Sequence, residues 1–385
     1  MFSVCSESNR LRTMPAGVYL HIPFCKSRCS YCDFATDIYR SSDAVDRYVN
    51  AICKEIPGST DGNAEIDTIY FGGGTPSLLL PNQVERILNE VKSWFDVSED
   101  VEITMEMNPA TVTPETLAGY RSIGVNRASF GVQTFDDREL KLLARGHDAN
   151  DALNTFALLR DAGFDNISFD LIAGLPGQTL DGWRRNLDQS IAMSPEHMSL
   201  YLLEIHEGTP LAEQLRSERR PALDEELAAE MYEVMLDQLL AAGYQQYEIS
   251  NFSRPGFESR HNSKYWRLDP VYGYGVSAHS FDGFQRYANE RDTAKYVERM
   301  EQFSVAEVSR ERIDAASEFI FLGLRLTEGI DLEKYSERFG LKLEEKYQSE
   351  IAEATAAGLL EIRAGRLMLT RRGMLFSNEV FSIFV

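Results

Sequence analysis

The chain has 385 residues, 43% of them hydrophobic and 26% charged, which suits a globular protein of two or three domains with a large core. Lys and Arg total 39 against 60 Asp and Glu, so the formal net charge of −21 argues against a general nucleic-acid binder, which needs a basic face. No apolar run approaches the roughly 18 residues of a membrane span, and no signal-peptide layout opens the chain. We therefore expect a cytoplasmic protein.

Residues 1–16 are polar and irregular, and we expect a flexible tail there. From residue 17 to about residue 240, apolar segments rich in Val, Ile, Phe and Tyr alternate with amphipathic segments of helical spacing. The expected strands are Gly17–Pro23, Thr68–Gly72, Val101–Met107, Arg127–Gln133, Asn166–Ala173 and His197–Ile205. The expected helices are Asp43–Ile56, Asn82–Phe95, Pro114–Ile123, Asn150–Ala162 and Leu180–Met193.

This alternation predicts an α/β fold with a parallel sheet and right-handed crossovers. The long repeat unit over residues 17–240 favours a partial (βα)6 barrel of the TIM type over a small doubly wound sheet. Periodicity by itself does not separate a closed barrel from an open one. In either case, the chemistry is expected at the carboxyl ends of the strands.

Two further regions follow the predicted barrel. Residues 241–305 form an extension rich in Tyr, Gly and Asn that contains the run His-Asn-Ser-Lys-Tyr-Trp. Residues 306–385 combine helices with a short hairpin over 358–370, which predicts a winged-helix-like C-terminal domain. Residues 310–385 hold 11 Lys and Arg against 13 Asp and Glu, a net charge of −2, so we assign this domain to packing or protein interaction rather than to nucleic acid.

Three of the five cysteines stand close together, directly after the first expected strand. Cys25, Cys29 and Cys32 have the spacing C-x3-C-x2-C. A loop this short can wrap three thiolates around a small inorganic centre, and iron–sulfur clusters are held by cysteine thiolates. Three protein ligands on a four-iron cluster leave one iron open to an exogenous ligand.

Three alternatives remain at this point. A zinc site would add His21 to the cysteines, although structural zinc sites usually pair C-x2-C with a second, distant pair. A redox disulfide between Cys29 and Cys32 leaves Cys25 unexplained. In the third alternative, the three cysteines are buried structural residues without a ligand. Cys53 is expected on the inner face of a helix, and Cys5, in the tail, has no assigned role.

The cysteine spacing after the first strand of a βα fold resembles that of the radical S-adenosylmethionine (SAM) superfamily, and the resemblance covers residues 17 to about 385. It implies a [4Fe–4S] cluster on the three cysteines. It also implies that SAM chelates the open iron through its amino and carboxylate groups. One electron from the reduced cluster then cleaves the cofactor.

Other residues at expected strand ends are candidates for cofactor binding. Phe71–Pro76 holds three glycines, which let the backbone approach a ligand closely, although a tight turn explains them equally well. Glu106 ends the third strand, Arg145 has a rigid fork for a carboxylate, and Asp170 is a charged residue in an apolar strand. A surface strand end and a solvated helix end are the alternatives for Glu106 and Arg145.

These positions match the coproporphyrinogen dehydrogenase branch of the superfamily. The resemblance implies that Tyr19, Gly73 and Glu106 bind one SAM molecule. It implies that a second SAM molecule is lined by Tyr31, Gly74, Thr75, Gln133, Arg145 and Asp170.

Two departures argue against decarboxylation of coproporphyrinogen. The dehydrogenases carry a further cysteine where this chain has Phe34, and they have a longer N-terminal segment before the first strand. The Cys-Asp-Phe ending resembles that of the sister group, the HemW-type heme chaperones. The segment from Glu248 to Gly256 and the run from His261 to Trp266 resemble that group as well.

The second resemblance implies heme as a ligand. His261 is the candidate axial ligand, because neutral imidazole binds heme iron, and Tyr265 and Trp266 offer stacking surface for a macrocycle. Alternatively, His261, Asn262 and Trp266 satisfy one another in a packed loop. His279 is a second candidate ligand. The remaining histidines have structural interpretations, and these are His21, His147, His197 and His206.

Three hypotheses follow. The first is a cytoplasmic heme chaperone that binds heme, a [4Fe–4S] cluster and SAM, and delivers heme to a respiratory acceptor protein. It allows transient membrane association through that acceptor, and a homodimer. The second is an oxygen-independent coproporphyrinogen III dehydrogenase, which forms protoporphyrinogen IX by way of a 5′-deoxyadenosyl radical. The third is a cluster-bearing scaffold without turnover.

Overall fold

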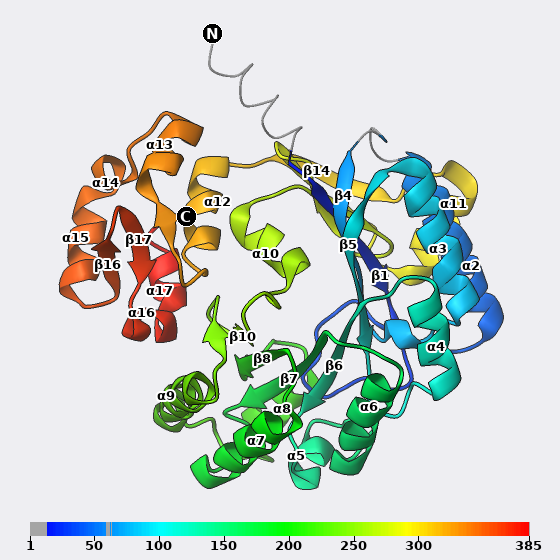
Figure 1. Ribbon diagram of the computed structural model, residues 1–385, viewed down its shortest axis with the longest axis horizontal. Helices are drawn as coiled ribbons and strands as arrows, with labels where there is room; N and C mark the ends of the chain where they lie inside the picture. Colours follow the sequence, from blue (N-terminus) through cyan, green and yellow to red (C-terminus); the bar gives the residue numbers. More distant parts are fainter. Residues whose placement is uncertain (1–13, 59–61, 63, 385) are drawn as a thin grey trace.

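A computed structural model describes residues 14–58, 62 and 64–384 of the chain. Cys5 and most of the expected tail lie outside the described residues. The main element is a twelve-stranded sheet with the order β14-β13-β12-β11-β1-β4-β5-β6-β7-β8-β10-β9. The α/β fold class is confirmed, because the strands curve into an open barrel with helices on the outside (Figure 1).

Six central strands follow one another in chain order and pair in parallel. They are β1 (Ala16–Ile22), β4 (Glu65–Gly73), β5 (Asp96–Met107), β6 (Arg127–Gln133), β7 (Ile167–Ala173) and β8 (His197–Leu202). The six strands match the prediction, but β5 begins five residues earlier than expected and β8 ends at Leu202 rather than Ile205. All seven residues of β6 are buried, since this strand has helices on one side and the barrel interior on the other.

Amphipathic helices cover the outer face of these strands (Figure 1). On the first of them, Val45, Val49 and Ile52 lie at helical spacing and are fully buried or nearly so in the main core. These helices are α2 (Ser42–Glu55), α3 (Pro81–Trp94), α4 (Pro114–Ser122), α5 (Asp137–Leu142), α6 (Ala149–Asp161), α7 (Leu180–Met193) and α9 (Glu225–Ala241). Helix α8 (Pro210–Arg216) instead contacts the cysteine loop, where the Leu211 N–H donates to the Ser30 carbonyl at 2.8 Å. Most of the helices begin at an Asp, Ser or Thr whose side chain accepts a hydrogen bond from a free backbone N–H of the first turn.

The segment after α9 adds strands to both edges of the sheet. Next to β8 it forms β10 (Asn251–Ser253) and β9 (Gln245–Gln246), which are antiparallel. It then passes through α10 (Arg260–Arg267) and reaches the other edge, where β11 (Val271–Tyr274) pairs in parallel with β1. The remaining elements there are β12 (His279–Phe281), β13 (Gln285–Asn289), α11 (Thr293–Phe303) and β14 (Glu307–Arg312).

Helix α10 lies inside the curve of the sheet rather than outside it (Figure 1), and it contacts both β4 and α12. A small parallel pair, β2 (Phe24–Cys25) and β3 (Asp37–Ile38), closes the loop that carries the three cysteines. The loop is therefore held at both of its ends. The sequence did not indicate β11, because its Tyr and Gly residues lack the alternation of a half-buried strand.

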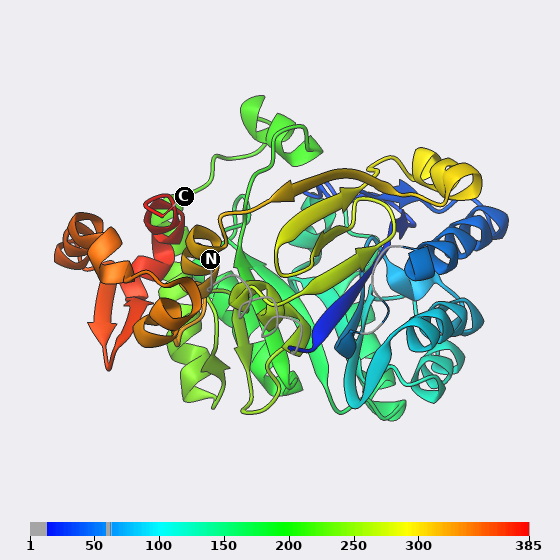
Figure 2. The same ribbon diagram turned by 90° about the horizontal axis from the view of Figure 1, so that it is seen from above.

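The C-terminal module, residues 315–384, has its own apolar core and lies at one end of the molecule (Figure 2). Its helices are α12 (Ala315–Gly323), α13 (Leu332–Phe339), α14 (Leu343–Lys346), α15 (Gln348–Ala356), α16 (Arg371–Leu375) and α17 (Ser377–Phe381). The expected hairpin is present as β16 (Leu360–Arg363) and β17 (Arg366–Leu369), with β15 (Ile330–Asp331) on its open edge. Over the described part of the chain, we find no helix with the length and apolarity needed to cross a bilayer.

Candidate functional site

A cavity of about 770 Å³ opens at the carboxyl ends of the parallel strands. Its wall includes the cysteine loop, the strand ends, the middle of α9 and part of the C-terminal module. Most of the predicted site residues line it, namely Tyr19, Cys25, Cys29, Tyr31, Cys32, Gly73, Gly74, Glu106, Gln133, Arg145 and Asp170. Thr75 is buried just behind this wall, and His261 is not part of it. The fold thus gathers residues from six strands at the edge where chemistry is expected.

The three cysteine sulfurs have different neighbours. Thr75 Oγ1 donates to Cys25 Sγ at 3.6 Å, and Arg145 Nη1 donates to Cys29 Sγ at 3.4 Å. Cys29 and Cys32 belong to one turn, in which the Cys32 N–H donates to the Cys29 carbonyl at 3.4 Å. Burial raises the pKa of the Cys25 and Cys32 thiols. A bound metal centre would therefore be needed to keep both as thiolates.

The structure can be compared with two alternatives for the cysteines, a zinc site and a Cys29–Cys32 disulfide. All three cysteines are free thiols, so the described chain holds no Cys29–Cys32 disulfide. His21 cannot complete a zinc site as it lies, because its Nε2 is 2.9 Å from the Ala35 carbonyl and its Nδ1 is 3.1 Å from the Tyr19 hydroxyl. No group of three or more His, Cys, Asp or Glu side chains within the described ranges closes around a single ion. A four-iron cluster takes its thiolates on different irons, so it does not need that closure.

The glycine run of β4 passes very close to the cysteine loop. Gly73 has φ +111°, and a Cβ at this position would come within 2.7 Å of the His21 ring. A Cβ at Gly74 would lie 2.6 Å from the Pro23 carbonyl oxygen. Both positions therefore require glycine, and the backbone lies where a small ligand on the loop would be bound.

Glu106 is held by the end of β4. Its Oε1 accepts from the Tyr70 hydroxyl at 2.7 Å, and its Oε2 accepts from the Gly73 N–H at 3.1 Å. Burial raises its pKa to about 7 in spite of these hydrogen bonds. The Tyr70 ring stacks on Tyr19, with centroids 6.1 Å apart. This places Tyr19, Gly73 and Glu106 in one contiguous patch, as a shared ligand would require.

A chain of hydrogen bonds links the second predicted set to the cysteines. Arg145 Nη2 donates to the Asn108 amide oxygen at 2.6 Å and to the Gly131 carbonyl at 2.7 Å. The Asn108 amide in turn donates to Thr75 Oγ1 at 2.7 Å. Asn108 was not among the predicted residues, although its place directly after β5, beside Glu106, was a usable signal. Among the described atoms, Arg145 Nε is buried without a hydrogen-bond partner, so it remains available to an acceptor.

Gln133, at the end of β6, and Asp170, in the middle of the neighbouring strand β7, lie on the same wall. Gln133 has φ +69°, a left-handed conformation that is uncommon for residues other than glycine and is found often at functional sites. Burial raises the pKa of Asp170 to about 6, and the Arg127 guanidinium opposes this shift. Burial also raises the pKa of Tyr31, which belongs to the cysteine loop and lies near Arg145 and Asp170. The arrangement suits a polar, partly charged ligand in a water-poor setting.

His261 lies in the barrel interior, 1% exposed, at the start of α10. Its Nδ1 is 2.9 Å from Thr68 Oγ1 and its Nε2 is 3.2 Å from the Tyr265 hydroxyl. Its ring also stacks on Tyr70 at 5.0 Å, and burial lowers its pKa to about 3. As it lies, His261 has no free ring nitrogen. Axial ligation of heme by His261 therefore stays a prediction that requires these contacts to break.

The other histidines are spread over the fold. His279 is exposed on β12 and outside the cavity wall, whereas His206 lines it. His197 is fully buried, with Nδ1 2.7 Å from Ser168 Oγ and Nε2 2.8 Å from the Tyr247 hydroxyl. His147 Nε2 is 3.3 Å from the Val132 carbonyl. His147 and His197 thus have structural contacts of the expected kind.

Two family models match the chain. One, described as Radical SAM superfamily, matches residues 19–189, and another, described as HemN C-terminal domain, matches residues 311–376. The first interval contains the three cysteines and every predicted SAM contact, and the second covers most of the C-terminal module.

Several curated proteins match nearly the whole chain. "Heme chaperone HemW" of Bacillus subtilis is 35% identical over 375 residues, with 95% of this chain and 98% of that protein covered. "Heme chaperone HemW" of Escherichia coli is 34% identical over 377 residues, with 96% and 98% covered. "Radical S-adenosyl methionine domain-containing protein 1, mitochondrial" of Bos taurus is 41% identical over 268 residues, with 69% and 60% covered.

Among solved structures, coproporphyrinogen III oxidase (HemN) from Escherichia coli, described as a radical SAM enzyme, superposes with a TM-score of 0.85. The match covers 99% of this chain and 92% of that chain at 23% sequence identity. It shows that the two chains share the fold, from the open barrel to the C-terminal module.

Proposed function

Because this chain belongs to the HemW branch of the radical SAM superfamily, we propose that it is a heme chaperone of the radical SAM type. It would bind heme, carry a [4Fe–4S] cluster with SAM, and deliver heme to an acceptor protein of a respiratory chain. The observation that carries the proposal is one continuous cavity of about 770 Å³, which extends from the cysteine loop to the C-terminal module. Its size lies in the range of small-molecule and cofactor sites.

The residues present fit the cluster and its cofactor. Cys25, Cys29 and Cys32 would hold the cluster, which when bound and reduced supplies one electron. Tyr19, Gly73 and Glu106 would bind the SAM molecule on it. The Gly73 backbone lies beside the loop because no side chain intervenes, and the Glu106 carboxylate is already oriented by Tyr70. Five cysteines, three of them within eight residues, do not form the pattern of a disulfide framework, which suits a reducing compartment such as the cytosol.

Phe34 supports heme binding over porphyrinogen oxidation. Its side chain stands where the dehydrogenases have a cysteine, lines the cavity, and is 62% exposed. An exposed aromatic ring at the mouth offers apolar surface to a macrocycle. It has no thiol to take part in redox chemistry.

One observation favours the alternative, an oxygen-independent coproporphyrinogen III dehydrogenase. The residues for a second SAM molecule are gathered on the cavity wall, including Gln133, Arg145 and Asp170. A chaperone that only transfers heme has no evident need for them. We keep the alternative as an outcome of the test below.

The test reconstitutes the cluster without oxygen and gives the full chain either hemin or coproporphyrinogen III, in the latter case with SAM and a reductant. We expect stoichiometric hemin binding and no protoporphyrinogen IX. Catalytic formation of protoporphyrinogen IX would overturn the proposal in favour of the dehydrogenase. If the chain binds the cluster but neither tetrapyrrole, the result would favour the scaffold hypothesis.

A further inference from the structure

The end of the cavity that lies away from the cysteines is built differently from the end that holds them. Its lining residues contact one another. The Arg325 guanidinium lies 4.3 Å from the centre of the Trp266 ring, and the Tyr232 hydroxyl donates to the Ile249 carbonyl at 3.0 Å and lies 3.6 Å from the Met374 sulfur. All five residues line the cavity. This end therefore combines two aromatic rings, two apolar side chains and one guanidinium.

Helical periodicity explains why Trp266 faces this cavity and His261 does not. The two residues lie on α10, five positions apart, which corresponds to a rotation of about 140° around the helix axis. His261 and Lys264 face the barrel interior, where the Lys264 ammonium contacts Asp67 at 2.7 Å. Trp266 consequently points to the opposite side, toward the C-terminal module. The Trp of the His-Asn-Ser-Lys-Tyr-Trp run is the member that reaches the cavity.

The ion pair of Arg325 orients its guanidinium but leaves most of the N–H donors free. Its Nη2 lies 3.2 Å from Oε2 of Glu248, whose side chain has no solvent exposure. Glu248 is further satisfied by the Ser250 N–H at 2.9 Å and by the Asn251 amide. A guanidinium has five N–H donors, and this contact uses one of them. The buried carboxylate therefore orients a cation at the cavity wall and leaves most of its donors available.

Two donors at this place lack acceptors. Within the described part of the chain, Trp266 Nε1 and Arg325 Nε are buried and have no hydrogen-bond partner. Buried donors are nearly always satisfied in folded proteins, so two neighbouring exceptions on one cavity wall suggest that a ligand supplies the acceptor. A carboxylate is the natural acceptor for a guanidinium, which binds it through paired N–H bonds.

We infer that this end of the cavity is the seat of a flat apolar macrocycle with carboxylate side chains, in which Trp266 packs on the ring and Arg325 pairs with a carboxylate. The inference rests on the proposed function and specifies where heme is bound and by which residues. It assigns one part of the wall to the barrel, through Trp266, and the adjoining part to the C-terminal module, through Arg325, which contacts the Trp266 ring, and Met374. The seat exists only when the two parts are packed together.

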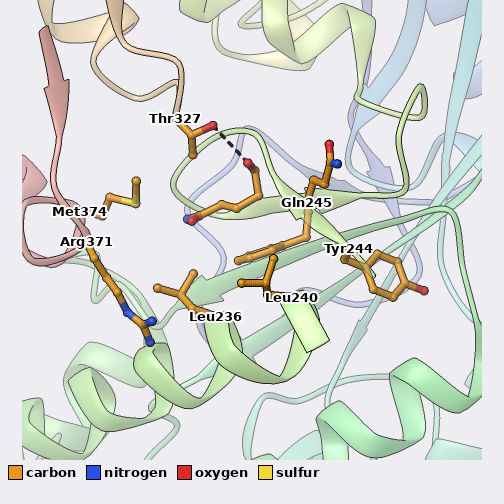
Figure 3. Close-up of a pocket in the computed structure, with 9 residues that line it drawn as sticks. Leu236, Leu240, Tyr244, Gln245, Thr327, Arg371 and Met374 are labelled. Atoms are coloured by element: carbon orange, nitrogen blue, oxygen red, sulfur yellow. Dashed lines mark hydrogen bonds between the residues drawn. The ribbon is translucent and has the colours of Figure 1, made fainter. Parts of the chain in front are cut away.

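A second, smaller cavity provides a matched control. Its volume is about 470 Å³, and it lies between α9, the β9–β10 region and α16, with Met374 on its wall as well (Figure 3). Its basic residue, Arg371, belongs to the same module as Arg325. The Arg371 guanidinium, however, is paired with both Glu233 and Asp237 on α9. Arg371 therefore does not need a ligand carboxylate as a partner.

The test compares hemin with its dimethyl ester, in which both propionates are uncharged, by absorption titration of the full chain. Arg325→Gln alone leaves Glu248 buried and unpaired, which destabilises the fold, so the main variant is Glu248→Gln/Arg325→Gln. We expect the wild-type chain to prefer hemin about tenfold or more. The double variant should bind both compounds with the ester's affinity, and Arg371→Gln should behave as wild type.

Each outcome decides a different point. A double variant that keeps the wild-type preference would refute the role of Arg325. A wild-type chain that binds hemin and its ester equally would refute the carboxylate contact and leave the chaperone function standing. Failure of the wild-type chain to bind hemin at all would overturn the proposed function and this inference together. Trp266→Leu should weaken binding of both compounds to a similar extent, because it removes the ring contact; unchanged affinity would remove Trp266 from the seat.

Discussion

Arg145 and Cys29 come from segments 116 residues apart, and the guanidinium of the first donates a hydrogen bond to the sulfur of the second at 3.4 Å. A buried cation next to a thiolate ligand stabilises the more negative, reduced form of a cluster. The same side chain donates to Asn108 and Gly131, so its position is fixed before any ligand is bound. This contact connects the second predicted cofactor set to the predicted cluster ligands.

We therefore expect Arg145→Met to assemble the cluster with a lower reduction potential than wild type, because the positive charge near Cys29 is lost. SAM affinity should fall by about tenfold, as for the loss of one charged hydrogen bond. An EPR-monitored redox titration and a SAM binding isotherm measure the two effects. Arg138→Met, at an exposed position of α5, is the control. An unchanged potential would mean that the guanidinium does not act on the cluster.

Replacement of Cys29 by Ala should abolish the visible absorption of the reconstituted cluster, because two thiolates do not retain it. Cys53→Ala is the matched control, since Cys53 is partly buried against the main core on α2 and far from the loop in sequence. Its variant should keep the full iron and sulfide content. Retention of the cluster in Cys29→Ala would show that the three cysteines do not form the ligand set.

A methyl group at Gly74 should disturb the cofactor site without touching the cysteines. The added Cβ would lie 2.6 Å from the Pro23 carbonyl oxygen, so β4 and the start of the cysteine loop must move apart. We expect SAM affinity to drop at least tenfold while much of the cluster is still assembled. In Gly58→Ala, the added Cβ meets nothing closer than 4.0 Å, and wild-type affinity is expected. Equal affinities for the two variants would contradict a close backbone contact at Gly74.

The raised pKa of Glu106 predicts a pH-dependent gain in stability for Glu106→Gln. The ordinary value of 4.5 rises to about 7 in the folded chain. Below pH 4.5 both states keep the proton, and between pH 4.5 and 7 only the unfolded state releases it. The free energy of unfolding therefore decreases as the pH rises through this window, and the total decrease reaches about 3 kcal/mol above pH 7.

Glu106→Gln removes this penalty, so its thermal midpoint should exceed that of wild type at pH 8 and match it near pH 4.5. The same substitution, Glu106→Gln, should abolish SAM binding. Glu99→Gln, at an exposed position of the same strand, should show no such trend. A gain for Glu106→Gln that does not depend on pH would contradict the raised pKa.

The position of His261 predicts that His261→Ala costs stability, whatever its effect on heme. The variant loses contacts to Thr68 and Tyr265 and leaves a cavity against Tyr70, which together cost about 2–4 kcal/mol. Denaturant unfolding of the chain measures this cost. Thr68→Val separates the two roles, because it frees Nδ1 while the imidazole stays. Weaker heme binding in His261→Ala alone, at unchanged affinity in Thr68→Val, would support axial ligation; equal losses in both would favour a structural role.

Local patterns in the sequence determined the architecture and predicted the cluster ligands. The spacing of Cys25, Cys29 and Cys32 is a property of one short loop, and the alternation of strands and helices depends on neighbours only a few positions apart. Gly73 and Gly74 were recognisable because a turn without side chains is also a local feature. These elements need no knowledge of the distant parts of the chain.

Only the tertiary structure decided which side chains meet in the cavity. Asn108 joins Arg145 to Thr75, β11 pairs with β1 across more than 250 residues, and α10 turns His261 inward and Trp266 toward Arg325. Such contacts depend on how separately formed elements pack and on which face of a helix is buried. Burial of His261 and exposure of Trp266 to the cavity follow from the rotation of one helix against the sheet. Charge and composition do not predict that rotation.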